Sequence, residues 1–405
     1  MRGHPPLDGQ EDGAGRRGSM VRRIGTIGFL GFLLAGLAAP TAPARAEAPE
    51  PDEARLKAEV FTLASPEFRG RRGEGGRKAS EHLVEAFRGL KLEPLFDGAY
   101  TQPIVEGTTG EVLGRNVGAK LVGADPALRH EWIIVSAHFD HLGVRRGVLF
   151  PGADDNASGV AMMLEVARSL ALSAEPPKRS VMFLGFDLEE VGLYGSRYFV
   201  EHAPVSLDRV RLFITADMIG RALGGVCRSY VFVMGSEHAP GLRPWIAAAA
   251  ERRPVTVGIL GSDMLLLDRS DYGPFRARKV PYLFFSTGEH PQYHTPGDTP
   301  ETLDYPKLAA ISRVILGVVR RAASAESVPK WNPVPDHPLS EAVTVRDVFR
   351  ALLEHRDGLQ IGSSQAFLLT NTLRKLEAIV ARGSITPGER AGMLNAARFV
   401  MIAVF

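Results

Sequence analysis

PGADDNASGV, residues 151–160, follows an apolar run that ends in SAHFDHLG (136–143) and precedes an apolar-periodic segment that starts at Val160. The first run has the pattern of a buried strand, and the second has the spacing of a helix. Short polar side chains and negative charge are favoured at a helix N-terminus, so we expect Asp154 to cap a helix over residues 158–172. Taken alone, the two aspartates of this stretch need no further explanation.

Predicted strands and helices alternate around this stretch. Apolar runs predict strands at 116–122, 132–137, 180–186, 211–216, 229–234 and 280–285. Helical spacing predicts helices at 52–64, 76–91, 158–172, 241–252 and 305–322. This alternation predicts an α/β fold, with a mainly parallel, mixed sheet that carries helices on both faces.

Ionisable side chains recur where these strands end. They are His138, Glu189, Glu190, Asp217 and His294, and Asp155 stands at a helix N-terminus in the same layer. Ligands of open α/β sheets bind beyond the carboxyl ends of the strands, so we expect these groups to converge. Several buried carboxylates are costly without positive charge, which predicts bound cations. Mixed imidazole and carboxylate ligands favour zinc over calcium or magnesium.

The adjacent pair Glu189 and Glu190 suits a hydrolytic metal site. Two metal ions bridged by one carboxylate lie about 3.5–4 Å apart and lower the pKa of a water between them. A carboxylate that does not bind metal can then accept and return the proton. Neighbours in sequence point in different directions, so one glutamate can bind metal while the other faces the water. The alternative explanation is an acidic first helical turn.

From about residue 54 to 322 the chain resembles peptidase family M28, a family of co-catalytic zinc peptidases best known from secreted bacterial aminopeptidases. The resemblance is carried, in family order, by HFDHLG, PGADDNASGVA, DLEEVGLYGS, TADMIG, RSDYGPF and QYHTPGDT. It implies a phosphorylase/hydrolase-like zinc exopeptidase architecture. It also implies two Zn²⁺ ions bridged by Asp155, with His138 and Asp217 completing one site and Glu190 and His294 the other.

The resemblance also implies roles for residues that do not bind metal. Glu189 matches the general base, and Asp140 matches a carboxylate that orients His138. Tyr293 matches a position that donates to the oxyanion in some members. The family often has a cis peptide bond after the bridging aspartate, here between Asp155 and Asn156.

The expected function is therefore an aminopeptidase that hydrolyses the N-terminal bond of a peptide with a free N-terminus, through a metal-bridging hydroxide and Glu189. A carboxypeptidase or dipeptidase on the same scaffold is an alternative, although large carboxypeptidase relatives carry an inserted domain for which this chain has no room. Glutaminyl cyclase relatives use one zinc and lose the first histidine, so His138 argues against that activity. Non-catalytic binding relatives have lost ligands, whereas this chain keeps them all.

Other polar residues near these motifs have simpler expected roles. We expect His141 to make a structural hydrogen bond, His290 to be solvated, and Arg269 and Asp271 to support the structure. We expect Met218 to belong to the core, with a place in the pocket for the first side chain of the substrate as the alternative. The basic cluster RGRRGEGGRK (69–78) is predicted to form a solvated turn.

The N-terminus has the pattern of an export signal. Met20-Val21-Arg22-Arg23 precedes an apolar run over 24–39 and the small-residue site Ala44-Arg45-Ala46. We therefore predict a signal peptide with an upstream extension over 1–46, starting at Met1 or Met20. The mature protein is expected to be periplasmic or secreted, without stable membrane insertion once the signal is cleaved. An uncleaved anchor is the alternative.

The remaining chain divides into a peptidase domain at 47–325, a Pro-rich linker at 326–340 and a helical extension at 341–405. Helices are predicted there at 343–356, 364–382 and 387–404, without a ligand-like cluster. The formal net charge of +2 gives no reason to expect nucleic acid as a partner. The single cysteine, Cys227, excludes an intrachain disulfide and a thiolate zinc cluster. The oligomeric state is not indicated.

Overall fold

The computed structural model describes residues 49–264 and 268–404, with side chains described to residue 400. The predicted signal peptide and upstream extension lie outside the described residues. Within the described part of the chain, no helix is both long enough and apolar enough to cross a membrane.

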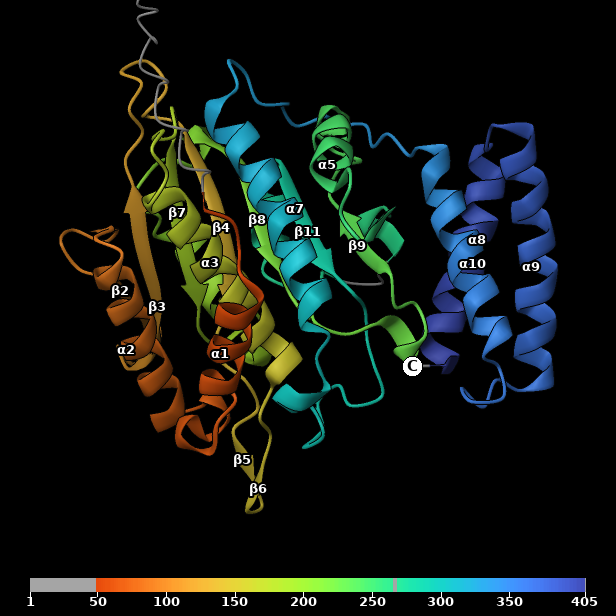
Figure 1. Ribbon diagram of the computed structural model, residues 1–405, viewed down its shortest axis with the longest axis horizontal. Coiled ribbons are helices and arrows are strands. Elements are labelled where there is room, and N and C mark those ends of the chain that lie inside the picture. The colour runs from red at the N-terminus through yellow and green to blue at the C-terminus, as the bar shows by residue number, and fades with distance from the viewer. Residues whose placement is uncertain (1–48, 265–267, 405) are drawn as a thin grey trace, which may run out of the picture. The chain divides into compact units, whose positions relative to one another are not determined.

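A nine-stranded mixed sheet forms the centre of the fold, with strands in the order β1-β3-β7-β4-β8-β11-β9-β10 and β2 paired to β3 (Figure 1). Its strands are β1 (Glu93–Pro94), β2 (Thr101–Val105), β3 (Val112–Leu121), β4 (Trp132–His138), β7 (Ser180–Phe186), β8 (Val210–Ala216), β9 (Tyr230–Met234), β10 (Thr256–Ile259) and β11 (Tyr282–Ser286). A separate hairpin pairs β5 (Val144–Arg145) with β6 (Val148–Leu149).

The strands that carry the predicted site residues run parallel to one another. β4 pairs in parallel with both β7 and β8, and β8 pairs in parallel with β11. The carboxyl ends of these four strands therefore meet at one edge of the sheet. Antiparallel pairing of β3 with β7 and of β9 with β11 makes the sheet mixed, as the sequence predicts.

Ten α-helices lie among the described residues. They are α1 (Glu53–Leu63), α2 (Glu74–Gly89), α3 (Gly159–Ala171), α4 (Tyr194–Glu201), α5 (Arg243–Ala250), α6 (Tyr272–Ala277), α7 (Tyr305–Ser324), α8 (Leu339–Glu354), α9 (Ser363–Arg382) and α10 (Pro387–Val404). The longer helices match the predicted ones to within four residues at each end. The elements that the sequence does not predict are all short: β1, β2, β5, β6, β10, α4 and α6.

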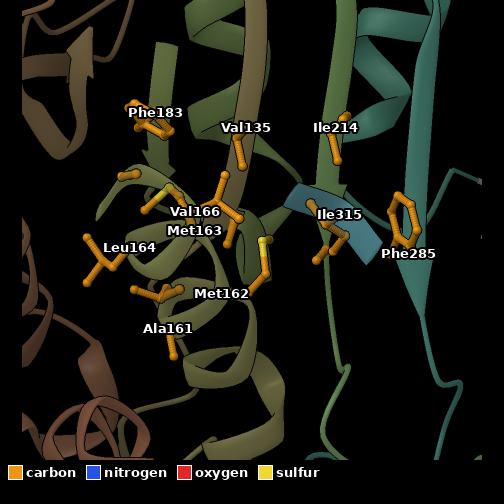
Figure 2. Close-up of a cluster of buried hydrophobic side chains, with 14 of the residues drawn as sticks. Val135, Ala161, Met162, Met163, Leu164, Val166, Phe183, Ile214, Phe285 and Ile315 are labelled. Carbon is orange, nitrogen blue, oxygen red and sulfur yellow. The ribbon is translucent and has the colours of Figure 1, made fainter. Parts of the chain in front are cut away.

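Alternating side chains of the strands divide the core between the two faces of the sheet. Val135, Ile214 and Phe285 point from β4, β8 and β11 to one face, where α1, α2, α3, α5 and α7 cover them. Figure 2 shows these three residues facing Met162 of α3 and Ile315 of α7. The period-2 alternation of the strands and the apolar faces of the helices together account for this layer.

The opposite face of the sheet packs against α4, α6 and the C-terminal helices. Ile134, Phe213 and Phe284 belong to one apolar cluster with Phe199 of α4, Phe275 of α6 and Phe349 of α8. Residues of α9 and α10 join the same cluster. Figure 1 shows α8, α9 and α10 packed side by side in blue. The predicted helical extension is therefore present and shares a core with the sheet. The predicted domain boundaries themselves remain predictions.

Candidate metal centre

The carboxyl edge of the sheet brings the predicted ligands together. His138 is the last residue of β4, and Asp217 directly follows β8. Glu190 lies in a single 3₁₀ turn (Glu189–Val191) after β7, and His294 lies in the loop after β11. Asp155 lies in the turn that leads into α3. Each side chain comes from a different segment, so the topology of the sheet creates the cluster.

The two carboxylate oxygens of Asp155 face different partners. His138 Nε2 lies 3.5 Å from Asp155 Oδ1 and 3.3 Å from Asp217 Oδ1. His294 Nε2 lies 3.1 Å from Asp155 Oδ2 and 3.1 Å from Glu190 Oε2. Asp155 is therefore shared between two groups of ligand atoms, one on each oxygen. These groups match the pairing that the family resemblance implies for two metal ions.

The cluster has a large excess of negative charge for its burial. His138 is 1% exposed and Asp155 is 3% exposed. Asp155 Oδ2 accepts no hydrogen bond from the described residues. No lysine or arginine of the described chain makes an ion pair with Asp155, Glu190 or Asp217. Buried carboxylates need compensating positive charge, so this donor set fits divalent cations.

The pKa values of the cluster reflect the same crowding. Burial raises the pKa of Asp155, and the neighbouring Glu190 carboxylate raises it further. Burial lowers the pKa of His294, but the adjacent carboxylates of Asp155 and Glu190 outweigh it and raise that pKa to about 10. Protons and cations are alternative ways to balance these charges, and ligating groups must release protons when metal binds.

Glu189 differs from Glu190 in its surroundings. Burial raises the pKa of the Glu189 carboxyl well above its ordinary value, and the charges of Asp217 and Asp271 add to this effect against that of His138. Burial also acts on Glu190, but contacts with His141 and His294 outweigh it and lower the pKa of the Glu190 carboxyl. The Glu190 carboxylate lies 2.7 Å from His141 Nδ1. The two glutamates thus have opposite protonation preferences, as two different roles require.

Asp140 is close to both His138 and the glutamate turn. Its Oδ1 lies 3.6 Å from His138 Nδ1, and that nitrogen lies 3.3 Å from the Asp140 backbone carbonyl. The Asp140 carboxylate accepts hydrogen bonds from the backbone N–H of Glu189, at 3.0 Å, and of Glu190, at 3.3 Å. Asp140 therefore also fixes the turn that carries both glutamates, a role that the sequence analysis did not foresee.

Two expectations about neighbouring polar residues were wrong. Asp154 does not cap α3, because its Oδ1 accepts from the backbone N–H of Gly220 at 2.6 Å. Asn156 Oδ1 instead accepts from the N–H of Gly159, the first residue of α3, at 2.9 Å. His290 is not solvated: it is 4% exposed, and its Nε2 lies 3.4 Å from Asp154 Oδ2. Both residues serve tertiary contacts that local sequence cannot reveal.

The turn before α3 fits tightly against the end of β8. Asn156 Nδ2 donates to the backbone carbonyl of Ala216 at 2.9 Å, one residue before Asp217. A Cβ atom on Gly159 would lie 2.4 Å from that same carbonyl oxygen, so only glycine fits there. The peptide bond between Asp155 and Asn156 is cis, as the resemblance implies.

Arg71 and Asp298 hold the Asp155 turn, and the sequence analysis missed both. Arg71 is fully buried and donates to the backbone carbonyls of Phe139, Pro151, Gly152 and Asp155, as well as Leu63. The expectation of a solvated turn is therefore wrong for Arg71, although Arg69 and Arg72 are exposed. The Asp298 carboxylate accepts from the N–H groups of Asp154 and Asp155. Only its place in QYHTPGDT signalled Asp298, and nothing in the basic run singled out Arg71.

The remaining predicted residues lie around the site. Tyr293 stacks on His294 with ring centroids 3.9 Å apart. His141 Nδ1 makes a hydrogen bond with Glu190 Oε1 at 2.7 Å, and it also lies 3.6 Å from Asp155 Oδ2, so His141 stands among the candidate ligand atoms around Glu190. Arg269 pairs with Glu289 at 2.7 Å, and Asp271 is fully buried with its pKa raised by burial to about 7. Met218 is buried, as expected for core, but it also lines a pocket beside Asp217.

A third group of metal-ligand types lies elsewhere, at Asp263, His337 and Glu341. There the guanidinium of Arg390 donates to both carboxylate oxygens of Asp263, at 2.7 and 2.9 Å. It also donates to both oxygens of Glu341, at 2.9 and 2.6 Å. All four carboxylate oxygens of this group thus already accept hydrogen bonds from a cation of the protein, so the group does not fit a metal ion.

Known proteins resemble this chain in sequence and in fold. A model of peptidase family M28 matches residues 116–319, just over half of the chain. Aminopeptidase YwaD of Bacillus subtilis is 30% identical over 216 residues, which cover 50% of this chain and 44% of that protein. The uncharacterized protein YfbL of Escherichia coli is 31% identical over 51% of this chain and 69% of its own length. The LapA aminopeptidase of Legionella pneumophila has a TM-score of 0.56 at 21% identity, over 68% of this chain and 72% of that one.

Proposed function

Because the chain belongs to peptidase family M28, we propose that it is a metallo-exopeptidase, an aminopeptidase that releases the N-terminal residue of a peptide with two zinc ions. The single observation that supports this most strongly is the position of Asp155. One oxygen faces His138 and Asp217, and the other faces Glu190 and His294. A carboxylate shared in this way is what a bridging ligand of two metal ions requires.

The residues present fit zinc as the metal. Besides the shared Asp155, the first group offers His138 and Asp217, and the second offers Glu190 with two nearby imidazoles, those of His294 and His141. Zinc accepts such a mixture, and calcium and magnesium do not favour it. Zinc held there would polarise a peptide carbonyl and lower the pKa of a bound water. Asp140 contributes by fixing the Glu189–Glu190 turn and by its position near His138 Nδ1.

Glu189 is the proposed general base. Its raised pKa lets the carboxyl group hold a proton taken from water and pass it to the departing amine. Tyr293 is the proposed hydrogen-bond donor to the developing oxyanion, because its ring lies directly on His294. Burial raises the pKa of its hydroxyl, so the phenol stays protonated and able to donate.

Two arginines beside the metal centre are already engaged by other groups of the protein. Arg71 donates to backbone carbonyls, and Arg269 pairs with Glu289. A carboxypeptidase would need an arginine or equivalent donor for the C-terminus, and these two do not supply it. The proposed substrate is a peptide with a free N-terminus. The sequence of residues 1–46 supports action in the periplasm or outside the cell, and nothing in the charge of the chain supports a nucleic-acid partner.

Paired substrates test this function. The purified protein, loaded with zinc after chelation, should hydrolyse a leucyl peptide and leave the N-acetylated peptide intact, and chelation should abolish the activity. Cleavage of both peptides at similar rates would overturn the aminopeptidase assignment in favour of a carboxypeptidase or endopeptidase. Hydrolysis that survives complete metal removal would overturn the metal dependence.

A further inference from the structure

A deep apolar pocket opens beside the candidate metal centre. Asp217 and Tyr293 lie at its polar end, and side chains of β9 and β11, including Phe232, Met234 and Phe284, line its interior. The pocket contains about 1020 Å³ of space outside the protein atoms, including its opening to solvent. Its position places the apolar interior next to any substrate group bound at the metal centre.

The far wall of this pocket comes from the C-terminal helices. Val345, Val348 and Leu352 line it from α8, and Ala397 and Val400 line it from α10. These helices lie outside residues 116–319, the part of the chain that matches the family. The sheet and loops of the peptidase region therefore form only one side of the pocket, and the extension supplies the opposite side.

We propose that the C-terminal helices determine substrate specificity, by completing a pocket that takes a large apolar N-terminal side chain such as leucine or phenylalanine. This inference rests on the proposed aminopeptidase function. The pocket interior presents aliphatic, aromatic and methionine side chains, so transfer of an apolar group from water into it is favourable. Apart from Asp217 at the metal centre, the charged residues on its lining are Arg269 and Glu289, which pair with each other. Away from the metal centre, the pocket therefore offers no unpaired charge for a basic or acidic side chain.

Fixed packing holds the helical wall in place. A Cβ atom on Gly258 of β10 would lie 2.7 Å from Thr344 Cγ2 of α8, so glycine permits the close approach of this helix to the sheet. Arg390 of α10 joins Glu341 of α8 to Asp263, which is next to the pocket residue Met264. The wall is thus attached to the sheet at one point and to a pocket loop at another, as a selective site requires.

Larger side chains on the pocket-facing sides of α8 and α10 test this proposal. Ala397→Trp on α10 and Val348→Trp on α8 each place a large ring in the pocket from a different helix. Asn395→Trp adds the same ring on the exposed side of α10 and serves as the matched control. The measurement is kcat/KM for alanyl, leucyl and phenylalanyl peptides with each purified, zinc-loaded protein.

The wild type and the control should prefer leucyl and phenylalanyl over alanyl peptides by about tenfold or more. Each pocket variant should lower that preference at least about tenfold, because cleavage of leucyl and phenylalanyl peptides should fall more than cleavage of alanyl peptides. A preference that survives in both variants would overturn the proposal. Equal cleavage of all three peptides by the wild type would overturn it too, while leaving the aminopeptidase assignment intact. No cleavage of any peptide by the wild type would overturn the proposed function itself.

Discussion

Among the described residues, histidine and carboxylate ligand atoms lie close together in two places, and the two clusters differ in what contacts their carboxylates. At the carboxyl edge of the sheet, Asp155 Oδ2 is buried and accepts no hydrogen bond from the described residues. At the C-terminal helices, Arg390 binds all four carboxylate oxygens of Asp263 and Glu341. Proximity of ligand types is thus insufficient to identify a metal site, and the two clusters are distinguished by whether a cation of the protein already contacts their carboxylates.

The difference also assigns a separate task to each cluster. A cluster whose carboxylates are already paired with an arginine can hold elements of the fold together. Here Arg390 connects α10 to α8 and to the loop that carries Asp263. A cluster with uncompensated carboxylates is stable when it binds cations. Substitutions in the first cluster should therefore change metal content and activity, and substitutions in the second should change stability.

The largest effect is expected from Asp155→Asn. Loss of the charge that the two groups share should weaken both metal positions together, and activity should fall to the uncatalysed background. Metal content by elemental analysis and peptide hydrolysis are the measurements. Full activity with the variant would show that the carboxyl-edge cluster is not the catalytic centre.

Glu189→Gln should separate metal binding from catalysis. Glu189 is not one of the proposed metal ligands, so the variant should keep its metal. Its turnover should fall by about 10²–10⁴-fold, the range expected for the loss of a general base. Glu190→Gln, at the next position, is the matched comparison and should lose metal. Near-normal turnover of Glu189→Gln would contradict the proposed role.

Arg390→Met should reduce stability and leave metal content unchanged. The substitution leaves the Glu341 side chain, which is 2% exposed, without its cation, so the free energy of unfolding should fall by about 3–5 kcal/mol. The control is Arg350→Met, which breaks an exposed pair with Glu377 and should cost at most about 1 kcal/mol. Denaturant unfolding measures both. Equally small losses in the free energy of unfolding for both variants would refute the proposal that Arg390 stabilises this cluster.

The smallest effect is expected from Asp140→Asn. The asparagine amide keeps one oxygen acceptor, but it lacks the negative charge beside His138. The hydrogen bonds from the backbone N–H groups of Glu189 and Glu190 should also weaken, so metal affinity should fall by about 10–100-fold. Competition with a chelator of known affinity measures this change. Unchanged affinity would show that Asp140 acts only on the backbone of the turn.

The sequence predicts this site better than it predicts the support around it. His138, Asp217 and the Glu189–Glu190 pair could be grouped because each follows a strand, and parallel strands end at one edge. The predictions for Arg71, His290 and Asp154 were wrong because each of these residues contacts a segment that is distant in sequence. Arg71 donates to the carbonyl of Pro151, and Asp154 contacts Asp298 and Gly220. A local pattern shows which side chains are polar but does not show which buried carbonyl or amide each one meets.

The fold shows the same division. The helical periodicity of the C-terminal segments predicts α8, α9 and α10, but it does not predict that α8 and α10 line the pocket beside Asp217. Short elements such as β10 and α6 carry too few residues to show a period. Their places in the fold come from packing against the long strands.

The most direct test of the central claim is the zinc content per chain of the purified protein and two variants. Wild type should bind two zinc ions, Asp155→Asn should bind fewer than one, and His337→Ala, in the cluster that Arg390 fills, should still bind two. That result would establish that uncompensated charge, and not the presence of ligand types, defines the metal site. Zinc retained by Asp155→Asn and lost from His337→Ala would contradict the account.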